Sequence, residues 1–183
     1  MFQVKRLYKW VLLLIYAILF SWAVNQYGIA LSVVNGTSMQ PTLRDGDYLL
    51  VNKLVFLWDK PERGDVITFR DPSDPSRYLV KRVMGVAGDT IQIKDGWLYR
   101  NGEKLKEEYI DSKIEDGNYG PVQVKPGTVF VMGDNRHRFA SRDSRYETVG
   151  LVPFKLVEGK VEWILWPSSQ RSDLLSSKEN NLK

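Results

Sequence analysis

The sequence contains no cysteine and only one histidine among its 183 residues. The absence of cysteine excludes disulfide bonds, thiolate zinc sites and a cysteine nucleophile. A single histidine cannot build a histidine-rich metal site, and we therefore expect neither a metal nor a cofactor. Amphipathic helical patterning is also scarce, because no stretch after residue 35 repeats apolar residues over four helical turns.

Charge is missing from a long stretch near the N-terminus, where residues 10 to 43 contain no charged side chain. Residues 8 to 27 are mostly apolar, and at about 1.5 Å per residue their roughly 20 residues match a bilayer core of about 30 Å. Trp10, Trp22 and Tyr27 lie near the ends of this run, where interfacial aromatic residues belong. The pattern predicts one transmembrane helix over residues 8 to 27.

Basic residues precede this run, namely Lys5, Arg6 and Lys9. Their excess on one side predicts a single-pass protein of the plasma membrane, with residues 1 to 7 in the cytoplasm and the rest outside the cell. The competing interpretation is a cleaved signal peptide, because GIA at residues 28 to 30 resembles a small-x-small cleavage site. The aromatic residues at both ends and the length of the run favour a retained anchor.

The net charge of +4 does not by itself indicate a nucleic-acid partner. Lysine and arginine are interspersed with acids and form no basic stripe, and the predicted topology places the main body outside the cell. We expect no nucleic acid among the partners.

The chain beyond residue 35 is rich in short segments of β-branched and aromatic residues separated by turn signals. The predicted strands are residues 48–53, 65–69, 78–86, 89–94, 97–100, 128–132 and 160–166. Asp95-Gly96 and Asn101-Gly102 are typical hairpin turns. The expected fold is mainly β, an antiparallel and barrel-like or folded-over sheet that forms an extracytoplasmic domain over residues 28 to 167.

Two polar stretches interrupt or follow this pattern. Residues 103 to 120 are polar and acidic, which predicts an exposed excursion. Residues 168 to 183 form a polar tail, which we expect to be disordered.

Ser38 lies in VNGTSMQPTL, residues 34 to 43, between an Asn-Gly turn and Pro41. A serine displayed in a turn can act as a nucleophile, provided that a neighbouring group takes its proton. The single histidine, His137, lies in a charged loop between two arginines, where a solvated side chain is expected. A lysine is the alternative base, because a Ser-Lys pair can replace the usual triad.

A lysine base must be neutral, so its pKa must fall from about 10.4 by roughly two units or more, which burial can achieve. Lys81 lies in YLVKRVMGV, where it is flanked on its strand face by the apolar Leu79 and Val83. A strand-face lysine can equally pair with a carboxylate or extend to water. The residues alone leave both interpretations open.

Four segments together resemble, in order, the conserved boxes of the bacterial type I signal peptidases. They are NGTSMQPTL (35–43), RGDVITF (63–69), YLVKRVMGVAGD (78–89) and GDNRHRFASRDSR (133–145). The resemblance extends from the predicted anchor over most of residues 32 to 166. It implies a membrane-anchored serine endopeptidase that removes N-terminal signal peptides from exported preproteins after small-x-small motifs. The implied partners are these signal peptides and membrane lipid.

The resemblance also implies residue roles, with Ser38 as the nucleophile and Lys81 as the general base. By the family pattern, Ser141 would hydrogen-bond and orient Lys81, and Asp143 and Arg145 would form a supporting ion pair.

Two features depart from the family pattern. Gly36 occupies a position where some members place a serine of the oxyanion hole, which leaves the Ser38 backbone N–H as one donor and the second donor unassigned. Residues 137 to 140 add two residues to the last box and leave the conformation of its loop open.

A peptidase of this kind must bind an extended peptide, and a β-protein does so by adding the peptide to a sheet edge. Side chains one and three residues before the cut then point the same way, which predicts two shallow apolar pockets. The candidate lining residues are Met39, Leu43, Leu79 and Val80 for the first pocket, and Val34, Ile67 and Val80 for the second. Each of these residues could instead belong to the core.

Two other functions fit part of this pattern. One is a non-catalytic, membrane-anchored β-domain that binds peptides or envelope components. The other is a self-cleaving Ser-Lys protein, although no helix-turn-helix pattern precedes residue 35. The distance between Ser38 and Lys81 discriminates between a catalytic pair and a non-catalytic domain.

Overall fold

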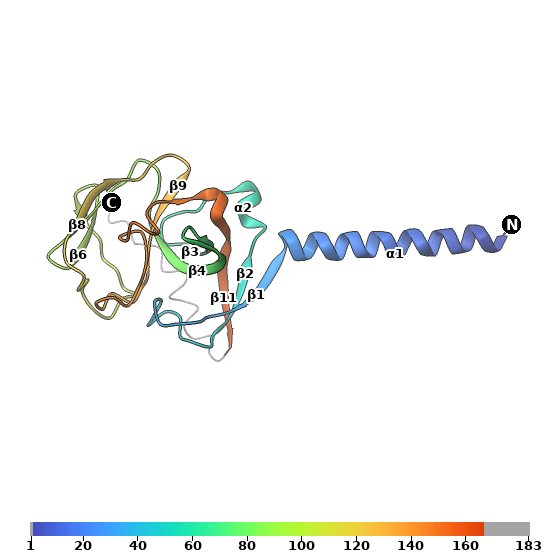
Figure 1. Ribbon diagram of the computed structural model, residues 1–183, viewed down its shortest axis with the longest axis horizontal. Coiled ribbons are helices and arrows are strands. Elements are labelled where there is room, and N and C mark those ends of the chain that lie inside the picture. The colour runs from blue at the N-terminus through green and yellow to red at the C-terminus, as the bar shows by residue number, and fades with distance from the viewer. Residues whose placement is uncertain (1, 167–183) are drawn as a thin grey trace.

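The computed structural model describes residues 2–166, with side chains at residues 7–22 and 28–166. Figure 1 shows helix α1 (Phe2–Tyr27) projecting from a β-rich body. Over the described residues, no helix combines the length and the hydropathy that a membrane crossing requires. The polar tail predicted at residues 168 to 183 lies outside the described residues.

The described body consists of two antiparallel sheets. The larger has seven strands in the order β1-β2-β11-β3-β4-β9-β10, and the smaller has four in the order β7-β6-β5-β8. The strands are β1 (Ile29–Val33), β2 (Tyr48–Asn52), β3 (Val66–Asp71), β4 (Asp74–Gly85), β5 (Thr90–Lys94), β6 (Trp97–Arg100), β7 (Glu103–Lys104), β8 (Tyr119–Gln123), β9 (Thr128–Met132), β10 (Val152–Pro153) and β11 (Val157–Trp166). The short helices are α2 (Val55–Trp58) and the 3-10 helix η1 (Phe154–Leu156).

The prediction of a mainly β, antiparallel body is confirmed, and each of the seven predicted strands overlaps an observed strand. Strand β1 was not predicted, because IALSV lies directly after the long apolar run with only Gly28 between them. Strand β8 was not predicted either, since its YGPVQ sequence contains the turn residues glycine and proline. Both are edge strands of their sheets, where the pattern of burial is weakest.

The prediction of an exposed excursion over residues 103 to 120 is wrong for its central part. Leu105, Tyr109 and Ile114 are buried in one core cluster with apolar side chains of the smaller sheet. These apolar residues are spaced at neither a strand nor a helix period, so the charged residues between them dominated the pattern. Residues 105 to 118, between β7 and β8, pack against the body as an irregular strap.

The C-terminal part of β4 packs against the smaller sheet, because Met84 lies in one core cluster with Ile91, Ile93 and Leu98. Strand β4 pairs with β3 along most of its length, but with β9 only at its C-terminal part, from Arg82 to Gly85. Its other residues therefore have one ladder partner in the described sheet. The smaller sheet lies at the end of the body remote from α1, whereas β1 and β2 adjoin α1 (Figure 1).

The burial of the strap predicts that Ile114→Ala is destabilising. Ile114 is 4% exposed, and truncation of a buried isoleucine to alanine costs about 2–5 kcal/mol through lost transfer energy and cavity formation. Denaturant unfolding of the variant measures this loss, with Glu103→Ala, at an exposed position of the adjoining β7, as the control. Equal stability of Ile114→Ala and wild type would show that the strap is not part of the core.

Candidate active site

The site is built around a contact between the turn that follows β1 and the middle of β4. Lys81 Nζ lies 2.7 Å from Ser38 Oγ and donates a 2.8 Å hydrogen bond to the carbonyl oxygen of Val80. Ser38 is displayed by a turn in which the N–H of Gln40 donates to the carbonyl of Thr37. The two residues that the sequence analysis selected as nucleophile and base therefore meet.

Lys81 is 2% exposed, because it lies in a strand paired with β3 and opposite Ile67. Burial, opposed by the carboxylates of Asp143 and Asp134, lowers the pKa of Lys81 to about 8. The nearby guanidinium of Arg142, like burial, lowers the pKa of Lys81. An appreciable fraction of this amine is therefore neutral at physiological pH, which a solvent-exposed lysine is not.

The nucleophile turn is attached to the loop that follows β9. The backbone N–H of Asn135 donates to the Ser38 carbonyl over 3.1 Å, and its side-chain amide donates to the Thr37 carbonyl over 3.0 Å. The Thr42 hydroxyl donates to Asp134 over 2.6 Å. These three bonds fix the backbone on both sides of the Ser38 hydroxyl.

Glycine is required at position 133 for this close approach. A Cβ atom there would lie 2.3 Å from both Ser141 Oγ and the Ser38 carbonyl oxygen. A side chain at residue 133 would therefore displace the nucleophile turn.

Asp143 is hydrogen-bonded to the other two predicted supporting residues, Ser141 and Arg145. Its carboxylate accepts hydrogen bonds from the Gly133 N–H at 3.1 Å, the Ser141 hydroxyl at 2.8 Å and Arg145 Nε at 2.8 Å. Asp143 and Arg145 thus form an ion pair, which is buried. The Ser141 hydroxyl donates its hydrogen bond to Asp143, and the Asp143 charge raises the pKa of Lys81. The expected hydrogen bond between Ser141 and Lys81 stays a prediction.

A second buried ion pair links the strand of Lys81 to the same loop. Arg82 donates to Asp134 at 2.7 and 3.0 Å, and both side chains are fully buried. Sequence reasoning missed Arg82, Asp134 and Thr42 as parts of the site. The sequence marked these residues only by their positions inside the four recognised segments. A charged residue such as Arg82 is usually exposed, so nothing in the pattern indicated that it is buried.

A groove of about 450 Å³ opens beside Ser38 and Lys81. Its walls include residues of β1, the nucleophile turn and β4, with Val34, Met39, Leu79 and Val80 among them, as predicted. Two predicted pocket residues do not line the groove: Leu43 and Ile67 are fully buried in the core. Strand alternation places Ile67 on the core side of β3 and its neighbour Thr68 in the groove wall.

His137 lies outside this arrangement. Its ring is 53% exposed, and Nδ1 lies 3.1 Å from Glu115. The added residues 137 to 140 dock on the strap, because the backbone N–H groups of Arg138 and Phe139 donate to Glu115 and Asp116. Within the part of the chain that the structure describes, no cluster of histidine, aspartate and glutamate could hold a metal ion.

Gly36 adopts a positive φ of 106°, which favours glycine over other residues. Its N–H donates to Asp45 at 2.6 Å, so this bond closes the turn before Ser38. Within the described residues the Ser38 N–H donates no hydrogen bond, so it is available to donate to an oxyanion.

Comparisons with known proteins agree on one family. The family described as "Signal peptidase, peptidase S26" matches residues 7–166. The chain is 37% identical to a signal peptidase I of Bacillus licheniformis, with 90% of this chain and 91% of the relative aligned. It is 39% identical to a signal peptidase I of Bacillus caldolyticus over 75% of this chain and 80% of the relative. A crystal structure of a signal peptidase I from Enterococcus faecalis V583 superposes with a TM-score of 0.47 and 34% identity, covering 56% of this chain and 97% of that one.

The burial of Lys81 predicts that Lys81→Met stabilises the protein. The pKa of Lys81 is about 8 in the folded chain against an ordinary 10.5, and each unit corresponds to about 1.36 kcal/mol, so the gain at pH 7 approaches about 3 kcal/mol. Between these two values the unfolded wild type binds more protons, so its stability rises with pH and the advantage of the variant shrinks.

Denaturant unfolding of both proteins at pH 7 and pH 10 measures this difference. Lys94→Met, at an exposed position of β5, is the control and should change neither value. A Lys81→Met protein that is less stable than wild type at pH 7 would contradict the desolvation of the amine.

Proposed function

The chain belongs to the signal peptidase family, peptidase S26, and on this premise we propose that Ser38 and Lys81 cleave the substrate as a nucleophile and a general base. The resemblance found in the sequence is confirmed by this membership. The protein is a serine endopeptidase that removes signal peptides. The observation that carries the residue assignment is the 2.7 Å contact between Lys81 Nζ and Ser38 Oγ.

Cleavage begins when the neutral amine of Lys81 accepts the proton of the Ser38 hydroxyl. Ser38 Oγ then bonds to the scissile carbonyl carbon, and the Ser38 N–H stabilises the developing oxyanion. The ammonium of Lys81 returns the proton to the leaving amine as the C–N bond breaks, which leaves an acyl-enzyme. Water hydrolyses the ester by the same route, with Lys81 again taking and returning one proton.

The supporting groups act on Lys81 and on the turn rather than on the substrate. We assign Asp143 and Arg145 to holding the loop at residues 133 to 145, and Ser141 to fixing the Asp143 carboxylate through its 2.8 Å hydrogen bond. Because the Asp143 charge raises the pKa of Lys81, against the effect of burial, its exact placement sets the fraction of neutral amine.

The groove gives the substrate an extended path to Ser38. We propose that the larger sheet curls into a barrel-like shape, which is supported by the presence of both β1 and β4 residues in one groove wall. A signal peptide would enter as an added strand, with its small side chains against Val34, Met39 and Val80. The polar Thr68 and the half-exposed Tyr78 would contact residues farther along the peptide.

We propose further that residues 8 to 27 anchor the protein in the plasma membrane and that the body lies outside the cell. Most of the described side chains of α1 are apolar and exposed, including Leu14, Leu19 and Phe20. Large apolar side chains are also exposed on one face of β1, β2 and β11, namely Ile29, Leu31, Val33, Tyr48, Trp163 and Trp166. Of these strands, β1 and β2 adjoin α1 (Figure 1). Tyrosine and tryptophan are typical of membrane interfaces, so this face supports a site held at the lipid surface.

If Lys81 is the base, kcat/KM rises with pH along a single ionisation near its pKa of about 8, because only the neutral amine accepts the proton. Ser38→Ala and Lys81→Ala should abolish cleavage of a preprotein. Lys81→Arg should be inactive as well, since a guanidinium does not deprotonate in proteins. His137→Ala is the matched control and should retain the rate and the pH profile. An active Lys81→Arg together with an inactive His137→Ala would assign the base role to histidine.

The topology is tested with protease added to intact spheroplasts that express the full chain. The body should be digested, and the N-terminus, which carries Lys5, Arg6 and Lys9, should be protected. Protection of the body would reverse the proposed orientation. A mature chain that begins near Leu31 would instead show that the apolar run is a cleaved signal peptide.

A further inference from the structure

The strap between β7 and β8 reaches the back of the active site, where it buries an acid and a phenol that the proposed mechanism does not use. We propose that Glu107 and Tyr109 are positioning residues, which hold the loop at residues 133 to 136 so that it presents Ser38 to Lys81. This inference rests on the proposed roles of Ser38 and Lys81. It assigns a part in the reaction to a segment outside the four recognised boxes.

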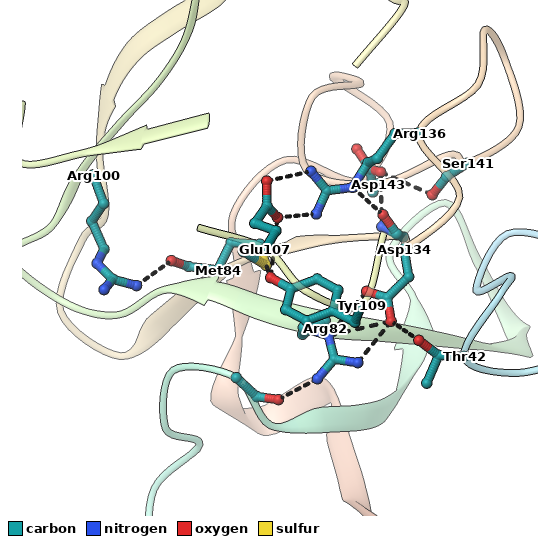
Figure 2. A network of polar contacts seen from close by, with 12 residues as sticks. Thr42, Arg82, Met84, Arg100, Glu107, Tyr109, Asp134, Arg136, Ser141 and Asp143 are labelled. Atoms are coloured by element: carbon teal, nitrogen blue, oxygen red, sulfur yellow. Dashed lines mark hydrogen bonds and ion pairs between the residues drawn. The ribbon is translucent and has the colours of Figure 1, made fainter. Parts of the chain in front are cut away.

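The first link runs from Glu107 through Arg136. The Glu107 carboxylate accepts two hydrogen bonds from Arg136, at 2.5 and 3.1 Å, and both side chains are buried (Figure 2). Arg136 Nε in turn donates to the carbonyl oxygen of Gly133 over 2.7 Å. Although burial acts against it, the Glu107 charge holds the pKa of Arg136 above its ordinary value. The guanidinium therefore remains charged and fastens both ends of the 133–136 turn.

The second link runs from Tyr109. Its hydroxyl donates to Glu107 over 3.0 Å, and the guanidinium carbon of Arg82 lies 3.9 Å from the centre of its ring. Burial, with the added effect of Glu107, raises the pKa of Tyr109, so the hydroxyl stays protonated and can donate. Arg82 is the partner of Asp134 in the same loop. The strap therefore contacts both arginines that hold the loop (Figure 2).

The loop transmits this support to the nucleophile by short steps. Gly133 is clamped between Ser38 and Ser141, and Asn135 donates to the carbonyls of Thr37 and Ser38. A rotation of the 133–136 turn would therefore move the Ser38 backbone. Glu107 is not among the described residues that line the groove, so the groove walls of β1 and β4 should still bind the peptide when the turn shifts.

The two possible roles of the Glu107–Arg136 pair predict different kcat values when the pair is removed. A pair that only stabilises the fold would leave kcat unchanged, whereas a positioning pair would not. Replacing both members of a buried pair by apolar residues of similar volume is often neutral for stability. The double variant Glu107→Leu/Arg136→Met should accordingly fold, yet it lacks the bond from Arg136 Nε to the Gly133 carbonyl. The double variant therefore tests the effect of the pair on kcat without a large change in Tm.

The test compares the full-length wild type and the double variant on an internally quenched peptide with alanine one and three residues before the scissile bond. We expect a Tm close to that of wild type, an unchanged KM and a kcat lowered on the order of 100-fold, the size that a small misplacement of reacting groups produces. Glu108→Gln, at the exposed neighbouring position of the strap, is the matched control and should leave kcat unchanged. A double variant that recovers wild-type kcat along with wild-type Tm would overturn the proposal.

Tyr109→Phe provides a second, milder test that does not depend on the folding of the double variant. It removes only the hydroxyl bonded to Glu107 and keeps the ring against Arg82, so kcat should fall with KM unchanged. Wild-type kcat in Tyr109→Phe would remove Tyr109 from the proposal. Ser38→Ala in the same assay reports on the proposed function separately, because residual cleavage by that variant would refute the nucleophile whatever the strap variants show.

Discussion

The burial of one amine, Lys81 Nζ, against one hydroxyl, Ser38 Oγ, is the constraint on which the rest of the structure depends. A lysine in water is charged and cannot accept a proton, so the fold must withhold water from it. Strand β4 achieves this by placing Lys81 opposite Ile67 in the interior, while the turn after β1 covers the amine with Ser38. The same burial makes the folded protein less stable at neutral pH, which is a common trade between stability and activity.

The buried charges around this pair hold its geometry. The ion pairs Arg82–Asp134 and Arg145–Asp143 bring two carboxylates into the interior, one within the turn at residues 133 to 136 and one bonded to its Gly133 N–H. Buried ion pairs contribute little net stability, because desolvation offsets their attraction. These ion pairs act on geometry instead. Each carboxylate accepts several hydrogen bonds and so fixes the loop whose backbone bonds to Ser38.

Much of this arrangement was predictable from the sequence, because its signals are local. Asp95-Gly96 and the alternating segments around it specify hairpins, and Lys81 stands out as a lysine that shares a strand face with the apolar Leu79 and Val83. The features that could not be predicted depend on contacts between distant segments. Glu107 and Tyr109 lie in a polar stretch without periodicity, and they are buried only because Arg136 and Arg82 meet them from other parts of the chain. Ile67 failed as a pocket residue for a related reason, since sequence spacing does not show which face of β3 meets the groove, and Leu43 failed because its turn buries it in the core.

The most direct measurement of the central claim is the pKa of the Lys81 amine itself. The Lys81 side-chain signal can be followed by NMR over a pH titration of the full chain with 13C-labelled lysine, and its assignment comes from the signal that is missing in Lys81→Arg. The account predicts a midpoint near pH 8, because burial outweighs the nearby carboxylates. A midpoint near 10.5, the ordinary value for lysine, would contradict it, because an amine that holds its proton up to that pH cannot activate Ser38.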